Sequence, residues 1–386
     1  MSGLLDGIRV LDMTNVLAGP FCTYQLALQG ADVAKIEMPG TGDLARHLGA
    51  DAELNRRAIG SSFLAQNAGK TSIELDLKNP DGKLAFAALV RDADVVVENF
   101  RPGVLASLGF GWAELQALNS RIVYCAISGF GADGPMAARP AYDQIVQGLA
   151  GMMDVTGEPD GRPTRIGFPV CDTFGGMTAC FAIVAALLRR SHTGEGAFVD
   201  VSMLDSSLTA LGWAASNWLI AGEEPTRNGN DNFTASPSGA FVTKSGLLNI
   251  AANQQSQFER LCAVVGRPAL VSDPRFVSRE DRLRHRQELN DELTAAFASR
   301  TAHEWEDLLN QSGVPAGRVL SVAEAFALDQ VVHRATVATL DAIPGTERPL
   351  RVVTTGFHVD GEAPARPSMP PALGEGNGRD RGRGLS

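Results

Sequence analysis

Short apolar segments with the composition of buried strands alternate with helical segments through the first two hundred residues. The expected strands are Ile8–Asp12, Val33–Glu37, Thr71–Leu77, Val95–Val97, Ile122–Ser128 and Phe198–Met203. A helix expected from Gly19 to Leu28 joins the first two strands, which makes a β-α-β unit of the doubly wound kind. This alternation predicts an α/β fold with a large Rossmann-like domain built on a parallel sheet.

The chain changes character near Gly222. Residues 223–232 are polar, rich in turn-forming residues and without periodicity, which marks a linker or a mobile loop. Beyond them a hairpin is expected at Phe241–Ile250, followed by helical patterns from Gln257 to about Leu309. A second, smaller unit of the α+β class is therefore expected.

These changes divide the chain into domains. The large Rossmann-like domain is expected over residues 1–205, completed by residues 330–375, and the small α+β domain over residues 225–325. From Glu362 the chain is rich in Pro, Gly and Arg and has little apolar content to pack. Residues 376–386 are expected to form a disordered tail.

An apolar helix, Thr173–Leu188, follows directly on Asp172 and ends at Arg189 and Arg190. Such a helix fits a buried position, with the cations placed at its negative end. Asp172 stands where the N-cap residue is expected, and an Asp there accepts a backbone N–H of the first turn.

The same geometry gives Asp172 a second interpretation. A carboxylate at the positive end of a helix stays ionised, and Gly175 and Gly176 would let a ligand approach the backbone closely. An ionised, uncrowded carboxylate is able to attack an acyl group. Capping is the commoner role of such an Asp, and the two roles do not exclude one another, so the rest of the chain must decide.

Charge and terminal sequence exclude several classes of function. The chain has 34 Lys and Arg against 44 Asp and Glu, a net charge of -10, and so lacks the basic field that duplex nucleic acid requires. The first six residues lack the cationic and apolar blocks of a signal peptide, and no apolar run is expected to reach the length of a membrane span. We expect a cytoplasmic protein that binds neither nucleic acid nor a membrane.

Five cysteines are spread over the chain: Cys22, Cys125, Cys171, Cys180 and Cys262. They contain no Cys-x-x-Cys pair and are odd in number, which favours buried apolar residues over a disulfide set or a zinc site, so no metal site is expected. Cys171, beside Asp172, is an alternative nucleophile, but no His stands where it would obviously serve as its base.

The loop Asn99–Arg101 follows the expected strand that ends near Glu98. In open α/β sheets the loops after the carboxyl ends of strands bind the ligand. Asn99, Arg101 and Lys70 are therefore candidates for contacts to an anion or an amide. A solvated surface charge is the alternative for Lys70 and Arg101.

These pieces, in this order, resemble the class III CoA-transferase family, also named for formyl-CoA and carnitine CoA-transferases, the CaiB/BaiF family. The resemblance runs from about Leu5 to Glu375 and lies in the shared order of short motifs rather than in any one of them. The motifs are Leu5–Asp12, Ala18–Pro20, Gly30–Glu37, Gly42–Asp43, Asn67 with Lys70, Glu98–Gly103, Tyr142–Asp143, Asp172 and Pro370–Pro371 with Leu373–Glu375.

The resemblance implies a nucleophilic carboxylate, and Asp172 occupies its place. It implies that Asp172 forms a mixed anhydride with the acyl group of an acyl-CoA and then a thioester with CoA. Thioester energy is conserved in such a cycle, so ATP, metal and a tightly bound cofactor are not expected, and coenzyme A enters as part of the substrate.

The resemblance also implies where CoA binds. Its adenine and phosphates are expected over the large domain, near the loop after Glu37. The expected CoA-binding residues are Asn15, Lys70, Asn99, Phe100, Arg101, Tyr142 and Gly229. In relatives a glycine-containing loop of the small domain shields the site from water, and Asn228–Asn232 stands in that region with fewer glycines.

The family is known for two chains threaded through each other as interlocked rings. An interlocked homodimer is therefore implied for this chain. The long connections around residues 205–225 and 325–350 would close the rings.

Two other functions remain open. The α-methylacyl-CoA racemases resemble this family and use a His-Asp pair, which would fall at Tyr142–Asp143 here. Tyr, with an ordinary pKa near 10, is a poor general base at neutral pH, which argues against the racemase. A CoA-binding protein without turnover is the second alternative, and the presence of Asp172 argues against it.

The resemblance says least about the substrates. Leu17 stands where formyl-CoA:oxalate enzymes carry Gln, which argues against oxalate as the acceptor acid. Many bacterial relatives use succinyl-CoA as donor and a small dicarboxylic acid as acceptor, and we expect the same pair of classes here. A basic residue near Asp172 would bind the second carboxylate, and Arg46, Arg139 and Arg165 are the candidates.

Overall fold

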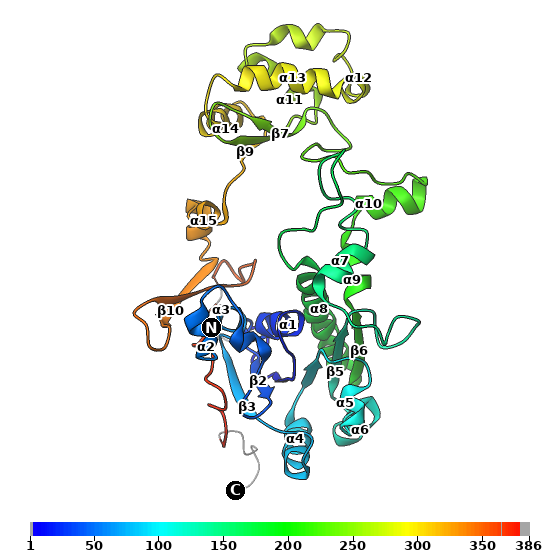
Figure 1. Ribbon diagram of the computed structural model, residues 1–386, viewed down its shortest axis with the longest axis vertical. Coiled ribbons are helices and arrows are strands. Elements are labelled where there is room, and N and C mark those ends of the chain that lie inside the picture. Colours follow the sequence, from blue (N-terminus) through cyan, green and yellow to red (C-terminus); the bar gives the residue numbers. More distant parts are fainter. Residues whose placement is uncertain (1–2, 364, 379–386) are drawn as a thin grey trace. The chain divides into compact units, whose positions relative to one another are not determined.

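The computed structural model describes residues 3–363 and 365–378, and these divide into two compact units (Figure 1). Unit 1 contains the chain up to residue 153, residues 165–224 and the chain from residue 329 onward. Unit 2 contains Asp154–Thr164 and Pro225–Leu328. The short segment Asp154–Thr164 therefore leaves unit 1 and returns to it, an excursion that no pattern in the sequence predicts.

Unit 1 is built on a parallel sheet of six strands, in the order β3-β2-β1-β4-β5-β6. The strands are β1 (Arg9–Asp12), β2 (Asp32–Glu37), β3 (Lys70–Glu74), β4 (Val95–Glu98), β5 (Val123–Ser128) and β6 (Ala197–Ser202). This is the doubly wound order, and the predicted α/β class is confirmed. The order reverses between β1 and β4, where ligand crevices form in such sheets.

Helices cover both faces of this sheet. One face packs against α1 (Ala18–Ala27) and α8 (Val170–Thr193), and the other against α4 (Pro80–Asp92), α5 (Val104–Ser107) and α6 (Trp112–Leu118). The continuous apolar run of β4 is fully buried because it lies between these two layers.

The remaining elements of unit 1 are short. They are η1 (Leu44–His47), α2 (Ala52–Arg56), α3 (Ser61–Leu64), α7 (Asp143–Leu149), α9 (Met203–Ala210), α10 (Trp213–Ser216), the π-helix Asn217–Ala221, α16 (Asp329–His333), β10 (Val337–Ala342) and β11 (Pro349–Val353). The antiparallel hairpin β10–β11 packs with α1 to α3, and the Tyr24 hydroxyl donates to the Val353 carbonyl at 2.8 Å.

The chain after the hairpin returns to β3, which contradicts the expectation that it packs poorly from Glu362. The Gly69 N–H donates to the Ser368 carbonyl, and the Gly376 N–H donates to the Ser72 carbonyl. Backbone hydrogen bonds hold this segment where apolar side chains are few. The expected tail begins at residue 376, which is thus tied to β3, and residues 379–386 lie outside the described part.

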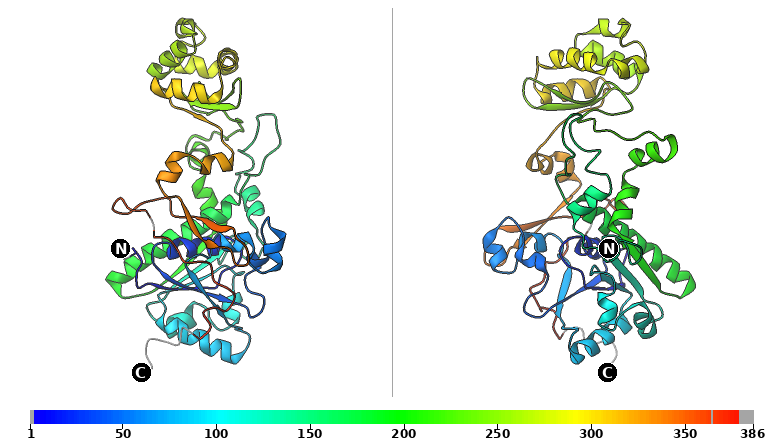
Figure 2. Two further views of the ribbon diagram at one scale, coloured as in Figure 1. Left: turned by 90° about the vertical axis from the view of Figure 1, so that its left-hand side faces the viewer. Right: turned by 45° about the vertical axis from the view of Figure 1, so that its right-hand side comes forward.

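Unit 2 is an α+β unit. Its antiparallel sheet has the order β7-β8-β9, with helices on one face (Figure 2). The elements are β7 (Ser238–Val242), β8 (Leu247–Ala251), α11 (Gln255–Val264), η3 (Pro268–Ser272), α12 (Arg279–Arg284), α13 (Arg286–Phe297), α14 (Ala302–Gln311), β9 (Ala316–Arg318) and α15 (Val322–Phe326). The predicted hairpin is β7–β8. The third strand, β9, is not predicted from the sequence pattern.

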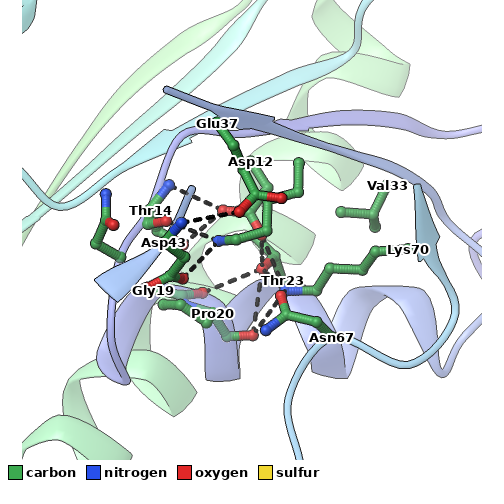
Figure 3. Close-up of polar contacts among 12 residues, drawn as sticks. Asp12, Thr14, Gly19, Pro20, Thr23, Val33, Glu37, Asp43, Asn67 and Lys70 are labelled. Carbon is green, nitrogen blue, oxygen red and sulfur yellow. Dashed lines mark hydrogen bonds and ion pairs between the residues drawn. The ribbon is translucent and has the colours of Figure 1, made fainter. Parts of the chain in front are cut away.

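Asp12, Lys35, Asp43 and Lys70 form a buried charge network beside α1, and Figure 3 labels Asp12, Asp43 and Lys70. All four side chains are fully buried, and two cations face two anions. Lys70 Nζ lies 2.9 Å from Asp12 Oδ2, and Lys35 Nζ lies 2.9 Å from Asp43 Oδ2. Burial alone would raise the pKa of Asp12, but the charges of Lys35 and Lys70 hold it well below its usual range. Replacing one of these four residues by a neutral one would leave the opposite charge buried without a partner.

Lys70 was expected to contact CoA, and its position corrects that expectation. It begins β3 rather than following a strand, and its ammonium group also donates to the Pro20 carbonyl, Thr23 Oγ1 and Asn67 Oδ1 (Figure 3). Four partners and full burial leave no donor for a phosphate. The Lys70 side chain therefore stabilises the fold beside α1.

Candidate active site

The amino end of α8 differs from the expectation for Asp172. The helix begins at Val170 after Pro169, so Asp172 is its third residue and not its N-cap. Among the described residues no donor hydrogen-bonds to the Asp172 carboxylate, which lies in the first turn without capping it. The capping interpretation of Asp172 is wrong, because the helix starts one turn earlier than the apolar pattern indicates.

Asp143 caps α8 instead, from the start of α7. Its Oδ1 accepts the N–H groups of Cys171 at 2.8 Å and Asp172 at 3.3 Å. Its Oδ2 accepts from Gln147 Nε2 at 2.6 Å, and the Gln147 amide oxygen in turn accepts the Ile166 N–H. The N–H groups that an N-cap would satisfy are thus occupied by a residue far away in the sequence.

Burial, and secondarily the negative charge of Asp143, raise the pKa of Asp172 to about 7. The expectation of a firmly ionised carboxylate at the helix end is therefore wrong. The Asp143 carboxylate takes the helix N–H groups that would otherwise favour the Asp172 anion, and it adds a like charge nearby. A carboxylate of this basicity is a stronger nucleophile than an ordinary Asp, and it still ionises near neutral pH.

Gly175 and Gly176 serve packing rather than ligand approach, which corrects another expectation. A Cβ on Gly176 would lie 2.4 Å from the Ala18 carbonyl oxygen, and a Cβ on Gly175 would lie 3.1 Å from Met203 Cγ. The two glycines let α8 pack closely against α1 and α9. This close packing fixes the position of Asp172 one turn away.

Asp172 lines a cavity of about 250 Å³ at the carboxyl ends of β1, β4 and β5. The cavity brings together most of the residues predicted for the site: Asn15, Asn99, Phe100, Arg101, Tyr142 and Asp172. The other residues of its wall include Val16, Leu17, Ala18, Arg139 and Met203. Its location is the switch point of the sheet, where a ligand crevice is expected.

Asn15 and Asn99 bridge this switch point. The Asn15 N–H donates to Asn99 Oδ1 at 2.8 Å, and Asn99 Nδ2 donates to the Asn15 carbonyl at 2.8 Å. Asn15 follows β1 and Asn99 follows β4, so the pair fixes the two loops to each other. Glu98 supports the second loop by accepting the Phe100 N–H at 2.6 Å and the Tyr124 hydroxyl at 2.9 Å.

A second cavity, of about 240 Å³, shares Asn15 and Phe100 with the first. Its wall combines apolar side chains with charged ones. The apolar residues include Met13, Ile36, Met38, Leu75, Leu77 and Leu108, and the charged residues are Glu37, Asp43, Asp76 and Lys78. Of this wall the sequence indicates Asn15, Phe100 and the loop after Glu37, but not the apolar residues. The available signal was position, since Met13 and Leu75 directly follow β1 and β3.

Other predicted residues lie elsewhere. Gly229 belongs to unit 2, where it lines a cavity of about 710 Å³. Arg46 is buried and bonded to both oxygens of Glu37 at 2.7 and 2.8 Å, so it has no free face for an acceptor acid. Arg165 is exposed and does not line the Asp172 cavity, whereas Arg139 does.

All five cysteines are buried and free. Burial raises the pKa of Cys171 to about 11, so its thiol is protonated at neutral pH and is a poor nucleophile. Within residues 3–363 and 365–378, no group of three or more His, Cys, Asp or Glu side chains is placed to hold a metal ion.

The expectation that no apolar run has the length of a membrane span is wrong for α8. The helix has 24 residues and a mean hydropathy of 1.7 in its most apolar window, of which 44% is buried inside unit 1. A core helix of this composition passes the same test as a spanning helix. Its buried side contacts the sheet and α1.

The sequence model of CoA-transferase family III matches residues 5–377. The chain belongs to this family. Acetyl-CoA:oxalate CoA-transferase from Acetobacter aceti is 39% identical over 368 residues, which cover 95% of this chain and 93% of the relative. Succinate–glutarate CoA-transferase from Agrobacterium fabrum is 38% identical over 96% of this chain and 93% of its own. The resemblance inferred from the motifs is confirmed, and the chain is a class III CoA-transferase.

Solved structures agree with the family assignment. A CAIB/BAIF family protein from Brucella suis superposes with a TM-score of 0.84 at 33% identity and covers 97% of this chain and 98% of its own. Rv3272 from Mycobacterium tuberculosis superposes with a TM-score of 0.86 at 31% identity. The match covers 98% of this chain and 99% of the Rv3272 chain. The class III CoA-transferase thus has the α/β architecture of the CAIB/BAIF structures over nearly its whole length.

The pKa of Asp172 predicts the pH dependence of transfer. If ionised Asp172 is the nucleophile, kcat/KM rises with pH up to about 7 and then levels. Asp143→Asn removes a negative charge beside Asp172, so the pKa of Asp172 falls and the acid limb moves to lower pH. A pH profile of kcat/KM for the acyl-CoA donor measures both.

Asp51→Asn is the matched control, because Asp51 caps α2 by accepting two backbone N–H groups but lies outside the cavity. Asp51→Asn should leave the acid limb of the kcat/KM profile at the pH of wild type. An acid limb that stays in place in Asp143→Asn would contradict the contribution of the Asp143 charge to the raised Asp172 pKa.

Proposed function

We propose that this enzyme moves CoA from an acyl-CoA donor, with succinyl-CoA as the first candidate, to a small dicarboxylic acid through covalent intermediates on Asp172. The observation that carries the proposal is the Asp172 carboxylate: it lines the cavity at the sheet switch point, it caps no helix, and its pKa is raised to about 7. These properties give a basic carboxylate that is free to attack an acyl carbon.

In the first half of the reaction the Asp172 carboxylate attacks the thioester carbonyl of the donor. The C–S bond breaks, CoA leaves as thiolate, and the acyl group remains on Asp172 as a mixed anhydride. The thiolate then attacks the Asp172 carbonyl carbon, which releases the donor's carboxylate and leaves CoA on Asp172 as a thioester. No water and no net proton enter these steps.

In the second half the carboxylate of the acceptor attacks the Asp172 thioester. CoA leaves again as thiolate and the acceptor becomes part of a new mixed anhydride. The thiolate attacks the acceptor's carbonyl carbon, which forms the product thioester and restores the Asp172 carboxylate. The energy of the thioester is kept throughout, provided that water is excluded while the anhydride exists.

The two adjoining cavities support an orientation for CoA. We place the adenine against the apolar side chains of the second cavity, such as Met13, Leu75 and Leu108, with Lys78 near its phosphates. The thiol end then passes Asn15 and Phe100, which the two cavities share, and reaches Asp172. Asn99 and Arg101 lie along this route, and Tyr142 lies in the cavity wall. Gly229, in unit 2, is kept among the CoA-binding residues on the family resemblance alone.

Replacing Asp172 tests the proposal. Asp172→Asn should lower transfer by about a thousandfold or more, because an amide does not form the anhydride. Screening small acids with succinyl-CoA and acetyl-CoA as donors, read by the mass of the product thioester, measures the loss. Wild-type turnover by the Asn variant would refute a covalent role of this side chain.

The same variant should be more stable than wild type at pH 8. A raised carboxyl pKa means that ionising Asp172 destabilises the fold, fully above pH 7 and not at all below about pH 4. Each pKa unit corresponds to about 1.4 kcal/mol, so a gain of about 1 kcal/mol or more in the free energy of unfolding is expected at pH 8. Urea unfolding at pH 8 and pH 4 checks the gain and its loss.

Arg139 is the residue that we propose for the second carboxylate of the acceptor, since it lines the Asp172 cavity. Arg139→Ala should raise KM for dicarboxylic acceptors about tenfold or more and affect monocarboxylic acceptors little. Arg165→Ala is the matched control, because Arg165 is exposed outside the cavity. Equal effects of both variants, or equal effects on both acid classes, would remove Arg139 from this role.

A homodimer is also proposed, and α8 supports it. Phe174, Met177, Phe181, Val184 and Leu188 recur at intervals of three and four residues and are exposed, Phe181 to 75% and Leu188 to 63%. An apolar stripe of this length marks a surface that another chain covers. The interlocked arrangement, with residues 205–225 and 325–350 as ring closures, rests on the family resemblance.

Light scattering should give twice the chain mass of 40.8 kDa. Because interlocked rings do not separate on dilution, tagged and untagged dimers should exchange subunits only after unfolding and refolding together. Phe181→Glu should prevent assembly during refolding, since it places a charge in the apolar stripe. A monomeric wild type would contradict the dimer, and exchange in native buffer would contradict the interlocking.

A further inference from the structure

Val16 has a backbone conformation that a β-branched residue rarely adopts. Its φ is 69°, in the left-handed region, and it stands in the turn between β1 and α1. A Val in this region is strained, and such strain persists only where surrounding groups hold it. Strained residues of this kind gather at functional sites, and Val16 lines the Asp172 cavity.

The Asp43 carboxylate holds Val16. Its Oδ1 accepts the Val16 N–H at 3.0 Å and the Ala45 N–H at 2.8 Å, while its Oδ2 pairs with Lys35 at 2.9 Å. Lys35 also donates to the Thr14 carbonyl at 2.7 Å. Asp43 and Lys35 thus fix the residues on either side of Asn15.

The Asn15–Asn99 pair fixes the middle of the same turn. The backbone of three successive residues, Thr14, Asn15 and Val16, is therefore held by side chains from β2, from the loop after β2 and from the loop after β4. Leu17 makes no side-chain cap to α1, so these outside contacts set where the turn enters the helix.

The turn forms part of the wall that surrounds Asp172. Val16, Leu17 and Ala18 line the same cavity as the carboxylate, and the Ala18 carbonyl packs against Gly176 of α8. A relaxed Val16 would turn the following peptide and move Leu17 relative to Asp172. The buried charge network therefore contacts the wall of the Asp172 cavity through backbone hydrogen bonds, from the Val16 N–H to Asp43 and from Lys35 to the Thr14 carbonyl.

We propose that Asp43 is a positioning residue of the transfer reaction: oriented by Lys35, it keeps Val16 in its left-handed conformation and so keeps the wall formed by Val16–Ala18 in place beside the acyl group. This inference rests on the proposed function. A purely structural ion pair is the alternative, and it would make Asp43 necessary for stability but independent of the conformation of Val16.

A double-mutant cycle separates the two roles. Asp43→Asn offers one acceptor oxygen where the carboxylate offers two, so it does not serve both Lys35 and the two N–H donors. In Val16→Gly the backbone at position 16 no longer needs the Asp43 contact to stay in the left-handed region, because glycine adopts positive φ without strain. We expect Asp43→Asn to lower kcat about tenfold with KM for the donor within about threefold, and to lower kcat less than about twofold in the Val16→Gly background.

Two control variants match the chemistry of the pair. Asp94 accepts the Arg9 N–H and pairs with Arg190 at 2.7 Å, so Asp94→Asn removes a comparable contact at the other end of the sheet. Ala58, with φ of 55°, is a strained residue outside the cavity, so Ala58→Gly relieves strain elsewhere. Neither should change kcat beyond about twofold.

Hydrogen exchange read by mass spectrometry gives an observation independent of activity. Asp43→Asn should speed exchange in the peptide that contains Thr14–Leu17, because the single acceptor oxygen of the amide is shared between Lys35 and the Val16 and Ala45 N–H groups, and leave the peptides of β4 unchanged. If Asp43→Asn unfolds the protein at assay temperature, Asp43→Glu, which retains the charge, takes its place in the cycle.

If the double variant lowers kcat by the product of the two single effects, Asp43 and Val16 act independently and the proposal is overturned. An unchanged kcat in Asp43→Asn would overturn it as well. Coupled effects together with faster local exchange would support it. Failure of the proposed function is distinguishable, because wild type would then transfer CoA between none of the tested acids while the exchange difference at Thr14–Leu17 would still be seen.

Discussion

The contact between the Asp143 carboxylate and the N–H groups of Cys171 and Asp172 underlies the site. It satisfies the start of α8 from outside, so the Asp172 side chain is not used as a cap. The same carboxylate places a negative charge beside a partly buried Asp172 and adds to the effect of burial on its pKa. This interaction thus leaves the Asp172 side chain free, fixes its backbone and adds to the basicity that burial gives it.

The loops around Asp172 are held by the same means, buried polar groups that accept or donate to backbone atoms. Asp43 and Lys35 hold the turn after β1, Asn99 joins that turn to the loop after β4, and Glu98 supports the second loop. Polar groups of this kind are costly to bury unless every one is paired. Their concentration at the carboxyl ends of β1, β2 and β4 indicates a preorganised site rather than a general way of stabilising the sheet.

The sequence predicted the parts of this structure that depend on local pattern. The apolar runs of β1, β2, β4 and β5 and the position of Asn99 after a strand followed from periodicity and from the rule for α/β sheets. The long-range contacts could not be read in this way. That Asp143 rather than Asp172 caps α8, that Lys70 is buried against Asp12, and that Gly176 packs on Ala18 all depend on which segments meet in space.

The central claim is that the carbonyl carbon of Asp172 becomes an acyl carbon during turnover. Incubating the enzyme with succinyl-CoA, reducing with borohydride and mapping the peptides by mass spectrometry tests this directly, because borohydride reduces an anhydride or thioester to an alcohol but leaves a carboxylate intact. The account predicts an alcohol at Asp172 that appears only when the donor is present. An unmodified Asp172 peptide from enzyme that is turning over would contradict it.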